Sequence, residues 1–275
     1  DSCECLLVIP ELNRVMSEEQ NSAKRGFDYE QNVVKYLKKY KFVPAGFTPA
    51  ASENRPDIKI QNSRGSGGCE LKISTRVGGG SVNFIHDKGK WKFETKYKMP
   101  EQQFLIKVAK KAGLMDMLAE KWDREPLKRT PVTKDLEALL GKMNKDQIYR
   151  ADLANFPSFQ FPVDPRVLEK YYVEKHAQYI NIGTHGLYTL GTSDPLGMNK
   201  SLVARRMKKV PRFADVATMF FVVTVKNKGV GKWHQFMVEG RFNVPIAKKS
   251  PYNLGATNGS TSSIIVDKSD LSCFL

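Results

Sequence analysis

The chain has 275 residues, enough for one large domain or two ordinary ones, and its 41% hydrophobic and 27% charged residues are typical of a globular protein rather than a disordered one. Lys and Arg number 44 against 29 Asp and Glu, a formal net charge of +15. Because Lys and Arg displace the counterions condensed on phosphates, this excess favours a nucleic-acid partner over a basic protein that binds no polyanion.

Several protein classes can be set aside. The sequence has no run of about 18 apolar residues, so no membrane-spanning helix is predicted and no membrane partner is expected. Residues 1–10 lack the basic region and cleavage site of a signal peptide, and we expect an intracellular, cytoplasmic protein, which includes a phage or viral protein acting in a host cell. The four cysteines, Cys3, Cys5, Cys69 and Cys273, are too few and too scattered for a disulfide framework and are expected to be reduced thiols.

The first strong helical pattern covers residues 17–40. Ser17 and the acids after it form a capping-box start, and Val33, Val34 and Leu37 recur near a helical period. Gly26 interrupts the pattern, which leaves a helix start at that residue as the alternative. Two short strands follow at residues 57–61 and 69–75, and residues 62–68, which include three glycines, are predicted to form the turn between them.

A second hairpin is predicted from residues 81–85 and 90–98. In its second strand Trp91, Phe93 and Tyr97 share one face. The other face carries four lysines that are candidate phosphate contacts: Lys90, Lys92, Lys96 and Lys98. A half-buried strand with its aromatic side chains in the core and its lysines in water explains the same pattern.

The remaining elements alternate between helices and strands. Helices are predicted at residues 101–121 (broken by Gly113), 132–143 and 165–178, and strands at 186–190, 218–225, 234–242 and 262–266. This succession predicts a mixed α/β or α+β architecture around a central sheet. No linker is evident, so we expect one elaborated domain over residues 1–275, with a subdivision near residue 155 as the alternative.

Residues 200–212 contain six basic residues and no acid, which favours phosphate contact over a surface helix without a partner. The candidates in this run are Arg205, Arg206, Lys208, Lys209 and Arg212. Arg76, close to glycines 78–80, is a further candidate, although a flexible loop is the commoner role of such glycines.

The pattern with the most chemical content is formed by Asp57, Glu70 and Lys72. Side chains at positions i and i+2 of a strand share a face, and pairing of the two strands brings Asp57 to the same face. Two carboxylates beside an ammonium suit a Mg²⁺ ion, with Mn²⁺ as the alternative, that activates a water for attack on a phosphodiester. Glu30 would join as a supporting group or metal ligand if its helix packs across the sheet. The competing interpretation is a solvated hairpin with a surface ion pair.

These residues resemble the PD-(D/E)xK nuclease superfamily, which includes restriction endonucleases, archaeal Holliday-junction resolvases and some phage and homing endonucleases. The matching segments, within residues 20–76, are Pro56-Asp57, Glu70-Leu71-Lys72 and the preceding helix with Gly26 and Glu30. The resemblance implies a restriction-endonuclease-like core with large additional helical and β segments. It also implies Asp57 and Glu70 as metal ligands, Lys72 as the catalytic lysine and Glu30 as the helix acid.

The function implied by this resemblance is a Mg²⁺-dependent endonuclease that hydrolyses phosphodiester bonds in DNA. An exonuclease of the same superfamily and a non-catalytic basic nucleic-acid-binding protein are the alternatives. An endonuclease that cuts both strands of a duplex needs two active sites, and a homodimer is one way to supply them.

Overall fold

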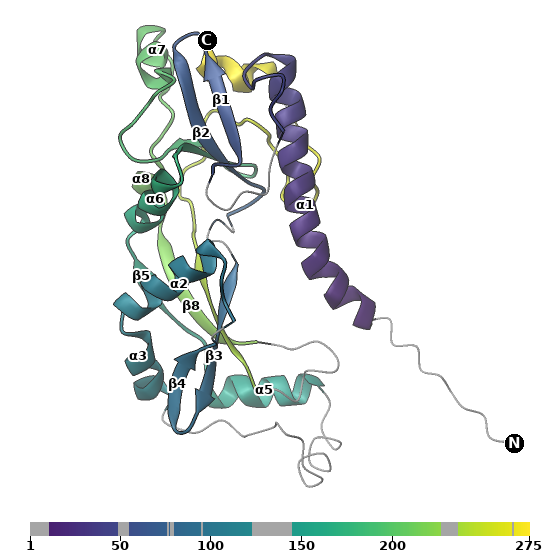
Figure 1. The fold of residues 1–275 in the computed structure, drawn as a ribbon, viewed down its shortest axis with the longest axis vertical. Helices are drawn as coiled ribbons and strands as arrows, with labels where there is room; N and C mark the ends of the chain where they lie inside the picture. Colours follow the sequence, from purple (N-terminus) through teal and green to yellow (C-terminus); the bar gives the residue numbers. More distant parts are fainter. Residues whose placement is uncertain are drawn as a thin grey trace, which may run out of the picture.

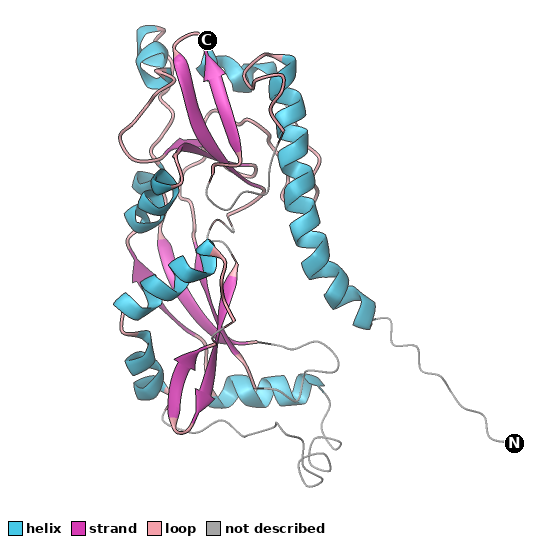
Figure 2. Cartoon of the chain, viewed as in Figure 1, coloured by secondary structure: helices cyan, strands magenta, loops and turns pink. Residues whose placement is uncertain are grey.

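A computed structural model describes residues 11–48, 55–75, 77, 80–94, 96–122, 145–226, 236–265 and 267–275. These residues form two β-sheets with helices packed against them (Figures 1 and 2). The mixed α+β class expected from the sequence is therefore confirmed, but the strands form two sheets rather than one central sheet. Within the described residues, no helix is both long and apolar enough to cross a membrane.

The first sheet lies at the top of Figure 1 and has four strands in the order β1-β2-β6-β7. Their bounds are Ile58–Asn62 (β1), Gly65–Lys72 (β2), Ala177–Ile182 (β6) and Gly186–Thr189 (β7). β2 pairs antiparallel with β1 and parallel with β6, while β6 and β7 are antiparallel. β2 is thus an inner strand, fixed on both sides.

The second sheet lies below the first and is antiparallel throughout, in the order β4-β3-β9-β8-β5. Its strands are β3 (Ser81–Asp87), β4 (Lys90–Phe93), β5 (Phe159–Val163), β8 (Met219–Val225) and β9 (Val238–Asn243). The tight β3–β4 turn uses Lys88 and Gly89, both at positive φ, as expected for a two-residue hairpin loop.

The longest helix, α1 (Glu11–Lys39), packs against the first sheet. The others are α2 (Pro100–Lys111), α3 (Leu114–Lys121), α5 (Lys145–Asn155), α6 (Pro165–Glu174), α7 (Met198–Ala204), α8 (Phe213–Val216) and the 3₁₀ helix η1 (Lys268–Phe274). Tyr29, Val33 and Leu37 of α1 are fully buried in one core with β1 and β2. Tyr29 also donates a hydrogen bond to the Gly255 carbonyl at 2.8 Å, which ties α1 to the C-terminal segment.

A second core joins the two sheets. It contains Leu105 of α2, Leu168 and Tyr172 of α6, Ile180 of β6 and Phe221 of β8. Each buried side chain of this size contributes about 1.5–3 kcal/mol of transfer free energy, so this core fixes α2 and α6 against the first sheet. The chain passes repeatedly between the sheets, and both sheets use strands from before and after residue 155. A cut at residue 155 therefore does not separate them.

Several expected boundaries were wrong. α1 is already helical before Ser17 and continues through Gly26, so neither residue begins it. The helix expected at residues 165–178 ends at Glu174, and residues 177–182 form β6, which the sequence analysis missed. Residues 262–266 form no strand where they are described, only an isolated bridge between Ala256 and Ile265. The helix expected at residues 132–143 lies outside the described residues.

Candidate active site

The β1–β2 hairpin places the central residues of the site. Its turn is shorter than expected, because the Asn62 side chain accepts hydrogen bonds from the backbone N–H groups of Arg64 (2.9 Å) and Gly65 (3.1 Å). The glycines expected in the turn, Gly65, Gly67 and Gly68, lie within β2. The hairpin register pairs Ile58 with Cys69, which brings Asp57, just before β1, opposite Glu70.

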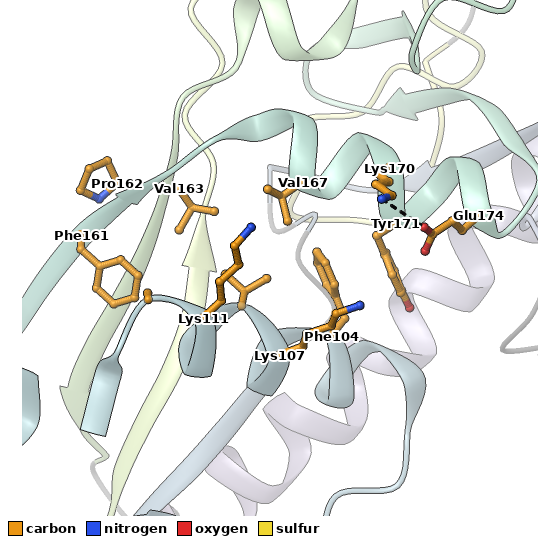
Figure 3. Close-up of a pocket in the computed structure, with 12 residues that line it drawn as sticks. Phe104, Lys107, Lys111, Phe161, Pro162, Val163, Val167, Lys170, Tyr171 and Glu174 are labelled. Atoms are coloured by element: carbon orange, nitrogen blue, oxygen red, sulfur yellow. Dashed lines mark ion pairs between the residues drawn. The ribbon is translucent and has the colours of Figure 1, made fainter. Parts of the chain in front are cut away.

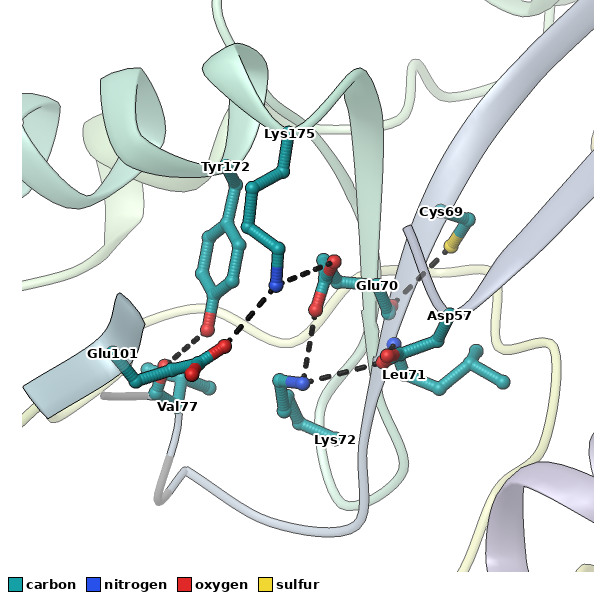
Figure 4. Close-up of polar contacts among 9 residues, drawn as sticks. All are labelled: Asp57, Cys69, Glu70, Leu71, Lys72, Val77, Glu101, Tyr172 and Lys175. Carbon is teal, nitrogen blue, oxygen red and sulfur yellow. Dashed lines mark hydrogen bonds and ion pairs between the residues drawn. The ribbon is translucent and has the colours of Figure 1, made fainter. Parts of the chain in front are cut away.

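Alternation along β2 separates its apolar and polar side chains. Cys69 and Leu71 face the core beneath α1, whereas Glu70 and Lys72 point to the other face, toward Tyr172 and Lys175 at the end of α6 (Figure 4). Asp57, Glu70 and Lys72 therefore share one face of the sheet, as expected from the spacing of the sequence.

Lys72 connects the two acids. Its Nζ lies 3.2 Å from Oδ2 of Asp57 and 3.0 Å from Oε2 of Glu70 (Figure 4). Asp57 Oδ2 also accepts a hydrogen bond from the Leu71 backbone N–H at 2.7 Å, which fixes the carboxylate against β2. The side chains of Lys72 and Asp57 are 24% and 20% exposed, so solvent reaches this side of the cluster.

Glu70 is the buried member of the cluster, with a side chain only 1% exposed. Its Oε1 is buried and has no hydrogen-bond partner, and Lys175 Nζ lies 3.8 Å from it. Lys175 in turn forms an ion pair of 3.2 Å with Glu101, at the start of α2. A buried carboxylate oxygen without a hydrogen bond is costly, and such an oxygen at a functional site is a natural ligand for a cation.

The pKa shifts of Glu70 and Lys72 agree with this geometry. Burial raises the pKa of Glu70, although the neighbouring Lys72 charge opposes the effect. Burial lowers the pKa of Lys72, but the Asp57 and Glu70 carboxylates raise it by more, so that it lies well above its usual value. Lys72 is therefore a fixed positive charge between two acids, and strong perturbation of clustered groups is typical of functional sites.

Glu30 lies on α1 at the margin of the cluster. Its pKa is raised to about 8, first by burial and then by the Asp57 charge, so the two carboxylates sense one another. It forms no hydrogen bond or ion pair with the residues that the structure describes. Nor does any set of three His, Cys, Asp or Glu side chains in those residues have the geometry of a metal centre, so Glu30 does not complete a three-acid site.

The residues present nevertheless fit a Mg²⁺ ion bound by two protein groups. Mg²⁺ prefers hard oxygen ligands, keeps several waters and is commonly bound through one or two carboxylates. Asp57 and Glu70 supply two such groups, and Glu70 Oε1 accepts no hydrogen bond, although Lys175 Nζ lies 3.8 Å away. The Lys72 ammonium lies within 3.2 Å of both carboxylates, so their negative charges already face one positive charge.

The basic residues of the second hairpin are mostly on its surface. Lys90, Lys92, Lys96 and Lys98 are all exposed, but only Lys90 and Lys92 lie in β4, which ends at Phe93. Two of them have acidic partners, Lys92 with Asp87 at 2.5 Å and Lys96 with Glu94 at 2.9 Å. Trp91 and Tyr97 are buried, so the aromatic face belongs to the core.

The run at residues 200–212 contains α7 and the loop after it. Arg205, Arg206, Lys208 and Lys209 are exposed, and Arg205 donates a hydrogen bond to the Ser272 carbonyl at 2.7 Å. Arg212 differs, because its guanidinium, 30% exposed, forms an ion pair of 2.7 Å with the nearly buried Glu169. Arg76 lies outside the described residues.

Sequence reasoning missed Glu101, Tyr172 and Lys175. They come from α2, α6 and the residue after α6. The ion pairs of Lys175 with Glu70 and Glu101, and the position of the Tyr172 ring beside Lys72, depend on how these helices pack. No spacing rule relates them to β2.

Comparisons of the chain with protein-family models, with curated proteins and with solved structures found no match.

Proposed function

We propose that the protein is a metal-dependent nuclease that hydrolyses phosphodiester bonds, most simply a DNA endonuclease. The observation that carries the proposal is the Asp57–Lys72–Glu70 cluster, in which one ammonium lies within 3.2 Å of two carboxylates, one just before β1 and one on β2. The +15 net charge supports a polyanionic substrate, because an acidic cluster in so basic a chain needs a cation to approach phosphate.

Each residue has a distinct role in this proposal. Asp57 and Glu70 would hold Mg²⁺ or Mn²⁺, which lowers the pKa of a bound water and offsets charge on the phosphate. Lys72 donates hydrogen bonds that orient the attacking water and balance the charge of the acids and the phosphate. Glu30, protonated over part of the neutral range, supports the cluster from α1.

The substrate and its cleavage mode are parts of the same proposal. An endonuclease needs an active site that a continuous strand can pass through. An exonuclease that uses the same chemistry needs a site that binds the end of a strand. If both strands of a duplex are cut, two copies of the chain would supply the two sites.

The competing function is non-catalytic binding of nucleic acid. It is favoured by the exposed basic run of Arg205, Arg206, Lys208 and Lys209, which alone accounts for salt-sensitive binding. The two functions differ in metal dependence, because binding through these residues needs no divalent ion and yields no product.

The test is cleavage of labelled circular, linear, branched and single-stranded DNA, and of RNA, in Mg²⁺, Mn²⁺ or EDTA. We expect products only with a divalent ion, and rates at least about 100-fold lower for Asp57→Asn and Lys72→Ala. Asp116→Asn and Lys35→Ala, which make the same changes at exposed positions on α3 and α1, should cut like the wild type. Equal cleavage by all five proteins would refute the assigned residues, and absence of any product would favour the binding function.

A further inference from the structure

A pocket lies between α2, β5 and α6 (Figure 3). Its volume is about 440 Å³, within the usual range for small-ligand pockets. Phe161 lines one end and the Phe104–Tyr171 pair the other, with Val167 between them (Figure 3).

The pocket is formed by the same two helices, α2 and α6, whose ends contribute Glu101 and Lys175 to the surroundings of Glu70. Glu101 and Phe104 are three residues apart on α2, and Tyr171 and Lys175 are four apart at the end of α6, so each pair shares a face. The Glu101–Lys175 ion pair and the Phe104–Tyr171 stack, with ring centroids 4.3 Å apart, are thus successive contacts between the same two segments. The first of these contacts reaches Glu70 and the second forms the wall of the pocket.

The lining combines apolar surface with positive charge. Phe104, Phe161 and Val167 provide the apolar part, and Lys107 and Lys111, one turn apart on α2, are exposed at its rim. A third lysine, Lys170, forms a long ion pair of 4.0 Å with Glu174. Lys107 and Lys111 therefore supply the positive charge that faces a ligand.

We propose that this pocket binds one unpaired nucleotide of the substrate strand, its base against the aromatic and aliphatic lining and its phosphate at Lys107 and Lys111. Aromatic side chains beside cations are the usual way to bind single-stranded nucleic acid, because bases stack while lysines contact the backbone. The placement of this nucleotide next to the cleavage site rests on the proposed nuclease function, whereas the binding itself does not.

The test compares two fluorescein-labelled 12-mers of equal charge, oligothymidylate and an abasic strand, by anisotropy in EDTA, where no cleavage occurs. We expect the bases to tighten binding by about tenfold in the wild type. Val167→Trp fills the pocket and should reduce this advantage to about twofold or less. Val173→Trp, the same change at an exposed position on α6, should keep it.

A second variant tests the two lysines at the rim of the pocket, which are exposed, so that their replacement does not disturb the core. Lys107→Ala with Lys111→Ala should weaken binding of both strands and preserve the preference for bases, because it removes phosphate contacts alone. Equal binding of the two strands by the wild type, or an unchanged base preference in folded Val167→Trp, would overturn the proposal. Displacement of the oligothymidylate by dodecanoate at similar affinity would also overturn it, since a fatty-acid pocket needs no base.

The outcomes separate this proposal from the proposed nuclease function. Base-dependent binding that Val167→Trp abolishes, without cleavage in Mg²⁺ or Mn²⁺, would support the pocket and refute the nuclease. Cleavage together with base-independent binding would refute the pocket alone.

Discussion

At the scale of single residues, Lys72 is the centre of the site because it supplies the positive charge between Asp57 and Glu70. Without it, the nearly buried Glu70 would keep only Lys175, at 3.8 Å, as a close cation. Unpaired buried charge is costly, so a divalent ion would substitute for the missing ammonium.

We therefore expect Lys72→Ala to lower the free energy of unfolding by about 2–3 kcal/mol in EDTA. Mg²⁺ should recover part of this loss and stabilise the variant more than the wild type. Denaturant unfolding with and without Mg²⁺ measures both effects. Lys92→Ala, which breaks the exposed pair with Asp87, should cost less than about 1 kcal/mol. A Lys72→Ala protein that is indifferent to Mg²⁺ would argue against a cation site.

The raised pKa of Glu30 predicts that the free energy of unfolding depends on pH. Its pKa is about 8 in the fold, raised by burial and by Asp57, against 4.5 for an ordinary Glu. Between these values the folded state binds more protons than the unfolded state, so the free energy of unfolding falls as pH rises through this window. Glu30→Gln should remove this fall, gaining up to about 4 kcal/mol over the wild type between pH 5 and pH 9. Urea unfolding at several pH values measures the gain, and a similar gain from the exposed Glu174→Gln would contradict it.

At the scale of elements, the glycines of β2 explain how the site is held. A Cβ on Gly68 would lie 2.2 Å from the His176 carbonyl oxygen and 2.6 Å from Pro56 Cγ. The bare backbone thus lets β2 approach both the segment that enters β6 and the residue before Asp57. In the sequence these glycines predict a turn, because glycine is common both in turns and in strands that another backbone approaches closely.

Gly68→Ala should therefore cost about 2–4 kcal/mol and displace Asp57, since backbone atoms cannot move aside. Gly46→Ala is the matched control, because nothing lies within 4 Å of its added methyl group. Thermal unfolding of both variants tests the difference. Equal melting temperatures would mean that β2 can accommodate a methyl group at Gly68, contrary to the close contacts in the structure.

Local patterns were enough to predict the hairpin that carries the site and the α+β class. Asp57, Glu70 and Lys72 converge because their spacing depends on strand alternation and one hairpin register. β6 was missed because it directly follows α6 and is buried on both faces, so it lacks the polar alternation of a half-buried strand. Its parallel pairing with β2, and with it Lys175 beside Glu70, depends on long-range packing.

At the scale of the whole molecule, the excess positive charge is only partly free to meet a substrate. Arg212 is held by Glu169, and Lys92 and Lys96 have acidic partners, whereas Lys208 and Lys209 are exposed beyond α7. The +15 thus includes charges that maintain the fold and charges that can contact phosphate.

Replacing Lys208 and Lys209 by Ala should weaken binding to duplex DNA in EDTA. The slope of log K against log salt concentration should fall by about 1–2, one unit for each lost phosphate contact. Lys24→Ala with Lys35→Ala removes the same charge from exposed positions on α1. Fluorescence anisotropy at several salt concentrations measures the slopes, and equal losses in the two double variants would show a general charge effect rather than a contact surface.

The central claim is that Asp57 and Glu70 together hold one divalent cation. Calorimetric titration of Mg²⁺ into the whole protein tests it most directly, with Asp57→Asn as the variant and Asp116→Asn as the control. We predict one ion per chain for the wild type and the control, and binding weakened at least about tenfold in Asp57→Asn. Equal affinity in all three proteins, or no saturable binding by the wild type, would contradict the claim.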